Sequence, residues 1–170
     1  AVIGSKGQLG TDLIQELQSE HEVTGLTHQD LEITDYDSCL TLKKHQPNVV
    51  INTAAFHKTD QCEEEPLKTF SANAIGARNI ATISREIEAV TIFISTDYVF
   101  DGAKGNYLEM DSTNPVNYYG LTKLEGEKKV IEYCKNYAIL RTSVLYGWHP
   151  WKQNFATWII NKLKQQQEIT

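Results

Sequence analysis

The stretch GSKGQLG, residues 4–10, follows three apolar residues and opens a segment with helical periodicity. Glycines in such a turn permit the close approach of a pyrophosphate, which the N-terminus of the following helix would stabilise. The position between a strand and a helix therefore predicts a dinucleotide-binding turn, with the pyrophosphate over residues 7–9. A phosphate-loop NTPase fits poorly because Lys6 precedes the second glycine, and a turn without a ligand is the alternative. The candidate contacts in this loop are Gly4, Gly7, Gln8, Leu9 and Gly10.

Strand-like and helix-like segments alternate along the rest of the chain. The expected strands cover residues 1–3, 22–26, 48–55, 90–96 and the first part of 137–147, and the expected helices cover 8–18, 36–45, 65–88, 119–134 and 153–165. This alternation predicts an α/β fold, a Rossmann-like doubly wound parallel sheet with helices on both faces. Residues 48–55 are apolar without alternation, which predicts a strand buried on both sides. Residues 1–170 are expected to form one NAD(P)-binding domain that carries the catalytic residues.

The composition narrows the class of protein. The net charge of −6 over 170 residues disfavours nucleic acid and anionic membranes as partners. We expect neither a membrane span nor a signal peptide. Cys39, Cys62 and Cys134 are far apart, which suits a reducing cytoplasm and argues against a disulfide framework. The carboxylates within residues 60–65 have no histidine or cysteine at metal-binding spacing, so no metal is expected.

The residues after the second expected strand bear on the choice of cofactor. A carboxylate at this position holds the adenosine ribose of NAD. Thr27 and His28 stand there instead, and Asp30 lies farther along. The missing acid leaves room for a 2′-phosphate, so NADP(H) is favoured and NAD(H) is the alternative. Thr27, His28, Asp30 and Leu31 are the candidate contacts.

A second pair of motifs adds chemistry at the same edge of the predicted sheet. ISTDYVFDG, residues 94–102, ends the fourth expected strand, and NYYGLTKLEGEK, residues 117–128, opens a helix on which Tyr119 and Lys123 share one face. A hydroxyl, a phenol and a lysine beside a dinucleotide are what a carbonyl reductase needs, because the phenol can protonate the substrate oxygen. A nearby ammonium favours the phenolate, so we expect Lys123 to lower the pKa of Tyr119. An isolated YxxxK is more often a surface pair, and its co-occurrence with the glycine loop favours catalysis.

Together with VVINTAA, DQCEEEP, NAIGARNIA and ILRTSVLYG, these motifs resemble the extended short-chain dehydrogenase/reductases, and within them the dTDP-4-dehydrorhamnose reductase family. The resemblance implies Thr96 as the partner of the substrate oxygen, Tyr119 as the acid and Lys123 as a contact of the nicotinamide ribose. It also implies that Asn73 supports this lysine through water. The remaining implied contacts are Ala54 and Ala55 for the cofactor, and Thr96, Asp97, Tyr98 and Tyr119 for the substrate.

The resemblance implies a reaction, the NAD(P)H-dependent reduction of the 4-keto group of a dTDP-4-keto-6-deoxy sugar. The product would be dTDP-rhamnose for surface polysaccharide, and the partner a nucleotide sugar. Related dehydratases carry Asp-Glu after the threonine, whereas here Asp97 is followed by Tyr98, so elimination would lack its base. The family continues beyond residue 170 with a substrate-binding lobe, so we expect this sequence to be a fragment or to belong to an incompletely ordered protein. The resemblance also allows a homodimer.

Two alternatives stay open. Val144 occupies the place of a family tryptophan, with Trp148 and Trp151 following, so the substrate could be a different nucleotide sugar. From another class, a non-catalytic NADP-binding regulatory subunit would resemble the beta subunit of methionine adenosyltransferase. His57 and Lys58 are weaker candidates for phosphate or substrate contacts.

Overall fold

The computed structural model describes residues 1–148 and 154–166. At its centre lies a five-stranded sheet in the order β2-β1-β3-β4-β5, with every pair of neighbours parallel. The strands are β1 (Val2–Ile3), β2 (Gly25–Leu26), β3 (Val49–Asn52), β4 (Val90–Thr96) and β5 (Tyr137–Thr142). This topology confirms the predicted doubly wound parallel sheet.

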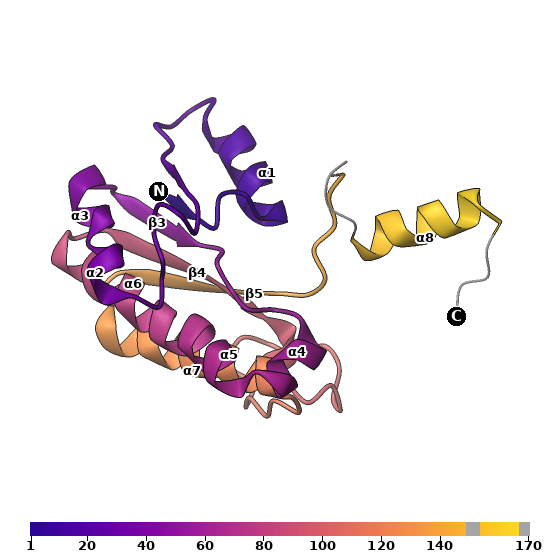
Figure 1. Cartoon of the computed structure of the whole chain (residues 1–170). Helices are drawn as coiled ribbons and strands as arrows, with labels where there is room; N and C mark the ends of the chain where they lie inside the picture. Colours follow the sequence, from indigo (N-terminus) through magenta and orange to yellow (C-terminus); the bar gives the residue numbers. More distant parts are fainter. Residues whose placement is uncertain (149–153, 167–170) are drawn as a thin grey trace.

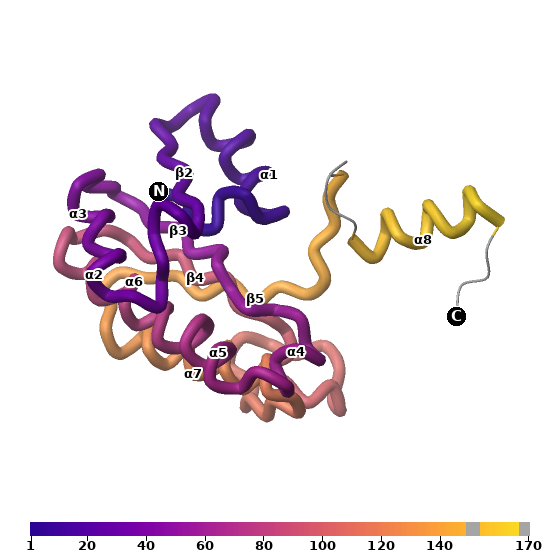
Figure 2. The backbone as a smooth tube through the Cα atoms, viewed as in Figure 1, coloured from indigo at the N-terminus to yellow at the C-terminus, as the bar shows by residue number. Residues whose placement is uncertain are grey.

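Helices lie on both faces of this sheet, as predicted, and the last helix lies apart from it (Figure 1 and Figure 2). They are α1 (Gln8–Leu17), α2 (Tyr36–Cys39), α3 (Thr41–His45), α4 (Thr59–Glu64), α5 (Pro66–Phe70), α6 (Gly76–Glu86), α7 (Tyr118–Tyr133) and α8 (Phe155–Lys164), with a π-helical turn η1 (Ser71–Ile75) and a 3-10 turn η2 (Asp97–Val99). Figure 1 shows α1 on one face and α2 to α7 on the other. The backbone traced in Figure 2 shows α8 apart from the sheet.

The order of the strands creates a crevice. From β1 the chain first adds β2 on one side and then β3 on the other, so β1 is the point at which the winding direction reverses. Connections leave the sheet in opposite directions at such a point, and ligands bind in the opening between them. The glycine loop follows β1 directly and therefore lies at this opening.

The core packs mainly against the face that carries α2 to α7. One buried cluster joins the sheet to α2, α3 and α6 through residues such as Val50 and Ile80. A second cluster joins β4 to α6 and α7 around Phe93, against which Ala77 and Val130 pack. This second cluster sets the position of α7, the helix that carries Tyr119 and Lys123.

Several predicted boundaries differ from the structure. The helix expected over 36–45 is two short helices that meet at Leu40, and the helix expected over 65–88 is divided into α5, η1 and α6. The sequence analysis missed α4, which ends before Glu65, a residue outside helical geometry (φ −119°, ψ 58°). Pro66 then starts α5 at its first position, where proline is tolerated. Gln153, the expected start of α8, and the last residues of the chain lie outside the described residues.

The prediction that residues 48–55 form a strand buried on both sides is wrong. The strand ends at Asn52, whose side-chain oxygen accepts a hydrogen bond from Ala54 N at 3.1 Å. Burial alternates along it, since Val50 is fully buried while Val49 is 37% exposed. The side chains of Val50 and Asn52 are buried, whereas Ile51 is only partly buried.

Gly126 allows α7 to pack closely on its neighbours. A Cβ at this position would clash with the carbonyl oxygen of Asn73 and lie 2.9 Å from Cζ of Phe93. We expect Gly126→Ala to lower the free energy of unfolding by about 1–2 kcal/mol, because overpacking outweighs the higher helix propensity of alanine. Urea denaturation measures the change, and Lys128→Ala on the exposed side of α7 is the control. A gain in stability for Gly126→Ala would show that helix propensity decides at this site.

Candidate active site

A cavity of about 1190 Å³ lies at the carboxyl edge of the sheet, where parallel sheets bind ligands. Its walls come from the ends of β1, β3, β4 and β5 and from the first turns of α1 and α7. The predicted site residues that line it are Gly4, Gly7, Gln8, Leu9, Gly10, Thr27, His28, Leu31, Ala54, Ala55, Thr96, Asp97, Tyr98, Tyr119 and Lys123. Asp30 and Asn73 are predicted site residues that lie outside this lining.

The glycine loop has the geometry that a close ligand requires. Gly4 has a φ of +79°, in the left-handed region that favours glycine, and its carbonyl accepts a hydrogen bond from Gly7 N at 2.8 Å. A Cβ on Gly10 would clash with the same carbonyl oxygen. Among the described residues, no side chain caps α1 at Gly7. The N–H groups of its first turn are therefore available to an anion, which fits a pyrophosphate.

In the segment after β2, the acidic residue that lines the cavity is Glu32 and not the predicted Asp30. Asp30 Oδ2 accepts hydrogen bonds from Thr27 Oγ1 at 2.6 Å and Thr27 N at 2.9 Å, and these bonds lower the pKa of Asp30. Its carboxylate is thus used within the turn. Glu32 lines the cavity instead, and its Oε2 lies 2.8 Å from His28 Nδ1. The sequence analysis missed Glu32, although a second acid in DLEITD was a readable signal.

The ends of β4 and α7 bring two hydroxyl groups together. Thr96 Oγ1 donates to Asp97 Oδ1 at 3.2 Å and accepts from Tyr98 N at 3.2 Å. The nearby Thr96 hydroxyl favours ionisation of the Tyr119 phenol, an effect smaller than that of burial on the pKa of Tyr119. The rings of Tyr98 and Tyr119 meet edge to face, with centroids 5.8 Å apart. Two adjacent hydroxyls at the cavity wall can hold one carbonyl oxygen.

The first turn of α7 is fixed by contacts that determine where Tyr119 lies. Asn117 Oδ1 accepts from Gly120 N at 2.7 Å, a typical N-cap. Glu63 Oε1, from α4, accepts from Tyr118 N at 2.8 Å. A Cβ on Gly120 would clash with the carbonyl of Tyr98, so this glycine lets α7 approach the end of β4.

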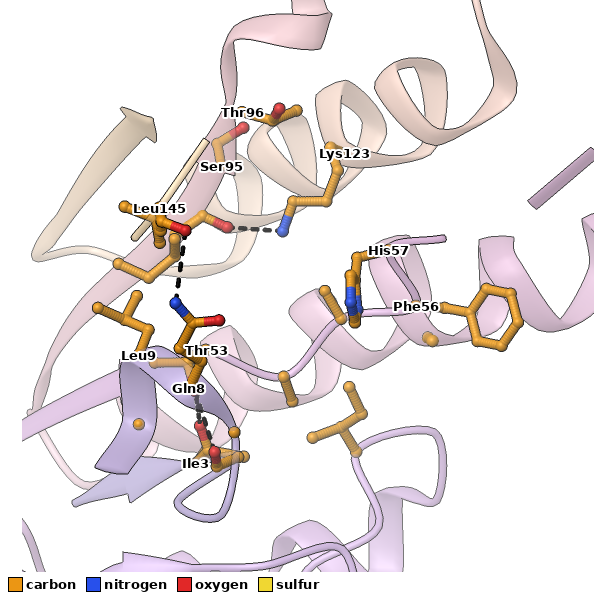
Figure 3. A pocket seen from close by; sticks show the side chains of 18 of the residues that line it. Ile3, Gln8, Leu9, Thr53, Phe56, His57, Ser95, Thr96, Lys123 and Leu145 are labelled. Atoms are coloured by element: carbon orange, nitrogen blue, oxygen red, sulfur yellow. Dashed lines mark hydrogen bonds between the residues drawn. The ribbon is translucent and has the colours of Figure 1, made fainter. Parts of the chain in front are cut away.

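Lys123 is bound to the sheet. It is buried, its Nζ donates to the Ile94 carbonyl at 2.6 Å (Figure 3), and it lies 4.0 Å from the centroid of the Phe93 ring. Burial lowers the pKa of Lys123 to about 7. Burial also raises the pKa of Tyr119 to about 12. The prediction that Lys123 lowers the pKa of Tyr119 is wrong for this structure, because desolvation of the phenol dominates.

The side chain of Asn73 joins the segment after β3 to α7. Its Oδ1 accepts from Phe56 N at 2.9 Å, and its Nδ2 donates to Phe56 O at 2.9 Å and to Thr122 Oγ1 at 3.0 Å. The predicted water-mediated link from Asn73 to Lys123 stays a prediction.

Comparison with known proteins adds to this geometry. The family model described as the RmlD substrate binding domain matches residues 1–170, the whole chain. The chain belongs to the RmlD substrate-binding domain family.

The chain is similar to several characterised relatives. SpsK, a spore coat polysaccharide biosynthesis protein of Bacillus subtilis, is 39% identical over 99% of this chain. The crystal structure of dTDP-4-dehydrorhamnose reductase from Bacillus anthracis in complex with NADP superimposes with a TM-score of 0.94 at 37% identity, again over 99% of this chain. Methionine adenosyltransferase 2 subunit beta from Bos taurus is 45% identical over 60% of this chain and 30% of its own length. The chain spans about 60% of the length of the first two relatives.

The RmlD-family chain departs from the expected pattern after β5. Val144 lines the cavity at the place of the expected tryptophan. Trp148 is 71% exposed and outside the lining, and Trp151 lies outside the described residues. The cavity is bridged near this segment by Gln8, whose Nε2 donates to Leu145 O at 3.4 Å (Figure 3).

Of the two weaker candidates for phosphate or substrate contacts, one lines the cavity and the other does not. His57 points into the cavity in Figure 3 and lines it, whereas Lys58 is not among the lining residues. Lys68 also lines the cavity.

Over residues 1–148 and 154–166, no group of three or more histidine, cysteine or acidic side chains could hold a metal ion. No helix in the same part of the chain is long and apolar enough to cross a membrane.

Proposed function

We propose that the chain is the dinucleotide-binding and catalytic part of an NAD(P)H-dependent reductase, which acts on the 4-keto group of a dTDP-4-keto-6-deoxy sugar. The observation that carries this proposal is that Thr96, Tyr119 and Lys123 line the same cavity as the glycine loop. The similarity to a named dTDP-4-dehydrorhamnose reductase supports the choice of substrate class. A substrate-binding lobe beyond residue 170 belongs to the same proposal.

The cavity fits a nicotinamide dinucleotide. The uncapped N-terminus of α1 would hold the pyrophosphate, and His28 with Thr27 would hold the adenosine ribose or its phosphate. The bound dinucleotide would supply a hydride, one proton with two electrons, to the carbonyl carbon. NADP(H) is the favoured form, in keeping with the NADP in the similar reductase structure.

The protein groups act on the substrate oxygen. The hydroxyl of Thr96 would hold that oxygen beside the phenol of Tyr119, which lines the same cavity. A pKa of about 12 keeps this phenol protonated at neutral pH, so a proton is available when negative charge develops on the oxygen. Lys123, at the base of the cavity, would contact the nicotinamide ribose.

The choice between NADPH and NADH depends on His28 and Glu32 in this account. Their side chains face each other at 2.8 Å, and His28 is 83% exposed. We expect His28→Ala to weaken NADPH by roughly two- to fivefold, the effect of a solvent-exposed charge contact, and to leave NADH nearly unchanged. Glu32→Gln should instead strengthen NADPH, because a carboxylate repels a 2′-phosphate.

Fluorescence titration of both cofactors measures these changes, with His21→Ala, at an exposed residue in the segment after α1, as the control. Equal weakening of NADPH and NADH by His28→Ala would place the 2′-phosphate elsewhere.

A second candidate function is supported by one comparison, the 45% identity to a methionine adenosyltransferase beta subunit. In that case the protein would bind NADP and regulate a transferase without turnover. NADPH oxidation by the full-length protein against a panel of 4-keto nucleotide sugars separates the two. Turnover of the dTDP-linked 6-deoxy sugar supports the reductase, turnover of another sugar nucleotide replaces the substrate, and co-purification with a transferase without turnover favours the regulatory subunit.

A further inference from the structure

Glu127 is a buried carboxylate without a role in the reaction described so far. It is 2% exposed and follows Lys123 by four residues on α7, so the two side chains share one helix face. Its Oε1 accepts from Ser95 Oγ at 2.5 Å and Arg141 Nε at 2.9 Å, and its Oε2 accepts from Arg141 Nη2 at 2.7 Å. Such complete burial of a carboxylate requires satisfied partners, and both oxygens have them.

These bonds join three elements at the catalytic edge. Ser95 and Arg141 are paired across β4 and β5 in the sheet, and Ser95 directly precedes Thr96. Arg141 Nη1 also donates to the carbonyl of Glu109 at 3.1 Å, which ties in the segment between η2 and α7. Glu127 thus binds α7 to the ends of β4 and β5, in addition to the bond from Lys123 to the Ile94 carbonyl.

The same carboxylate acts on the charge of Lys123. From β4 the lysine receives only neutral groups, the carbonyl of Ile94 and an aromatic ring, and η1 carries no charged residue. On α7 its titratable neighbours are Tyr119 and Glu127, and β5 contributes Arg141 through its bond to Glu127. Burial lowers the pKa of Lys123, and the negative charge of Glu127 opposes that effect. Without this charge, Lys123 would lose its proton at a lower pH.

We infer that Glu127 is a positioning residue, which binds α7 to β4 and β5 and supplies the counter-charge that favours the ammonium form of Lys123. An effect of Glu127 on catalysis rests on the proposed function, because Glu127 acts through Lys123 and Thr96. The charge relation itself would hold equally in a protein that only binds a dinucleotide.

The direct test is the titration of Lys123 in the full-length protein. NMR of ¹³C-labelled lysine follows the carbon next to Nζ, with the Lys123 signal assigned through its loss in Lys123→Arg. Glu127→Gln keeps the size of the side chain and removes its charge. We expect the pKa of Lys123 to fall by about one unit or more, because Arg141 is then an uncompensated cation as well. The matched control is Glu125→Gln on the same helix, where the acid is paired with Lys128 at the surface.

A second variant covers the case in which Glu127→Gln does not fold. Arg141→Gln leaves the carboxylate without its cation, and the pKa of Lys123 should then rise. An unchanged pKa of Lys123 in the variants that fold overturns the inference. If the protein turns over a keto sugar, the basic limb of its pH–rate profile should move to lower pH in Glu127→Gln. A slower rate with the basic limb at the same pH also overturns the inference. Absence of turnover in the wild type rejects the proposed function and leaves the NMR result intact.

Discussion

Tyr119→Phe should reduce turnover of the keto sugar by roughly 10²–10⁴-fold, the loss typical of a missing general acid, which corresponds to about 3–5 kcal/mol of barrier. The substitution keeps the ring that meets Tyr98 edge to face and removes only the phenol hydroxyl. Cofactor affinity should barely change, because the phenol acts on the substrate oxygen. Steady-state kinetics with a parallel NADPH titration measures both quantities.

Tyr118→Phe is the internal control for this result. Tyr118 is the preceding residue on α7, so its side chain points about 100° away around the helix, and its backbone N–H is bound to Glu63. Its hydroxyl should therefore be dispensable. Turnover that depends on Tyr118 and not on Tyr119 would show that the proton donor is assigned to the wrong tyrosine. Turnover that neither substitution changes would favour the regulatory subunit.

The second large effect is expected at the glycine loop. Gly7→Val should weaken dinucleotide binding by more than about 100-fold, or about 2.8 kcal/mol, because the new side chain occupies the approach to the α1 N-terminus. The fold should survive, since Gly7 has an extended backbone (φ −70°, ψ 166°) that any residue adopts. Its Cβ would lie 3.0 Å from the Gly4 carbonyl, which a small shift relieves.

Ser19→Val places the same side chain just beyond the far end of α1, on an exposed residue, and serves as the control. Fluorescence titration gives the affinities, and circular dichroism verifies the fold. Unchanged affinity in Gly7→Val would remove the glycine loop from the binding site.

The sheet could be predicted from the sequence because its signals are local. Strands alternate with helices, and the glycine loop follows the first strand. The sequence alone therefore predicts that the site lies at the carboxyl edge of the sheet. The boundaries around Glu65 and Asn52 were not predictable in the same way. One depends on where Pro66 starts a new helix, and the other on a side chain that turns back to Ala54.

The sequence predicted most of the residues that line the cavity and did not predict their electrostatics. Thr96, Tyr119 and Lys123 come together because two motifs end and begin at one edge of the sheet. The pKa of Tyr119 could not be inferred from its spacing to Lys123, because the effect depends on burial and on where a long side chain ends. Glu127 was missed for the same reason, since its partner Arg141 is distant in sequence.

The central claim is that this protein reduces a sugar carbonyl from a dinucleotide bound at the glycine loop. It is tested most directly with NADPH deuterated at C4 of the nicotinamide, in each of its two stereochemical forms, and the dTDP-4-keto-6-deoxy sugar. With one of the two forms, the sugar formed by the full-length protein should carry deuterium at its former carbonyl carbon, and Tyr119→Phe should form it far more slowly. A protein that binds NADPH tightly but leaves the sugar unlabelled and unreduced with both forms would contradict the account.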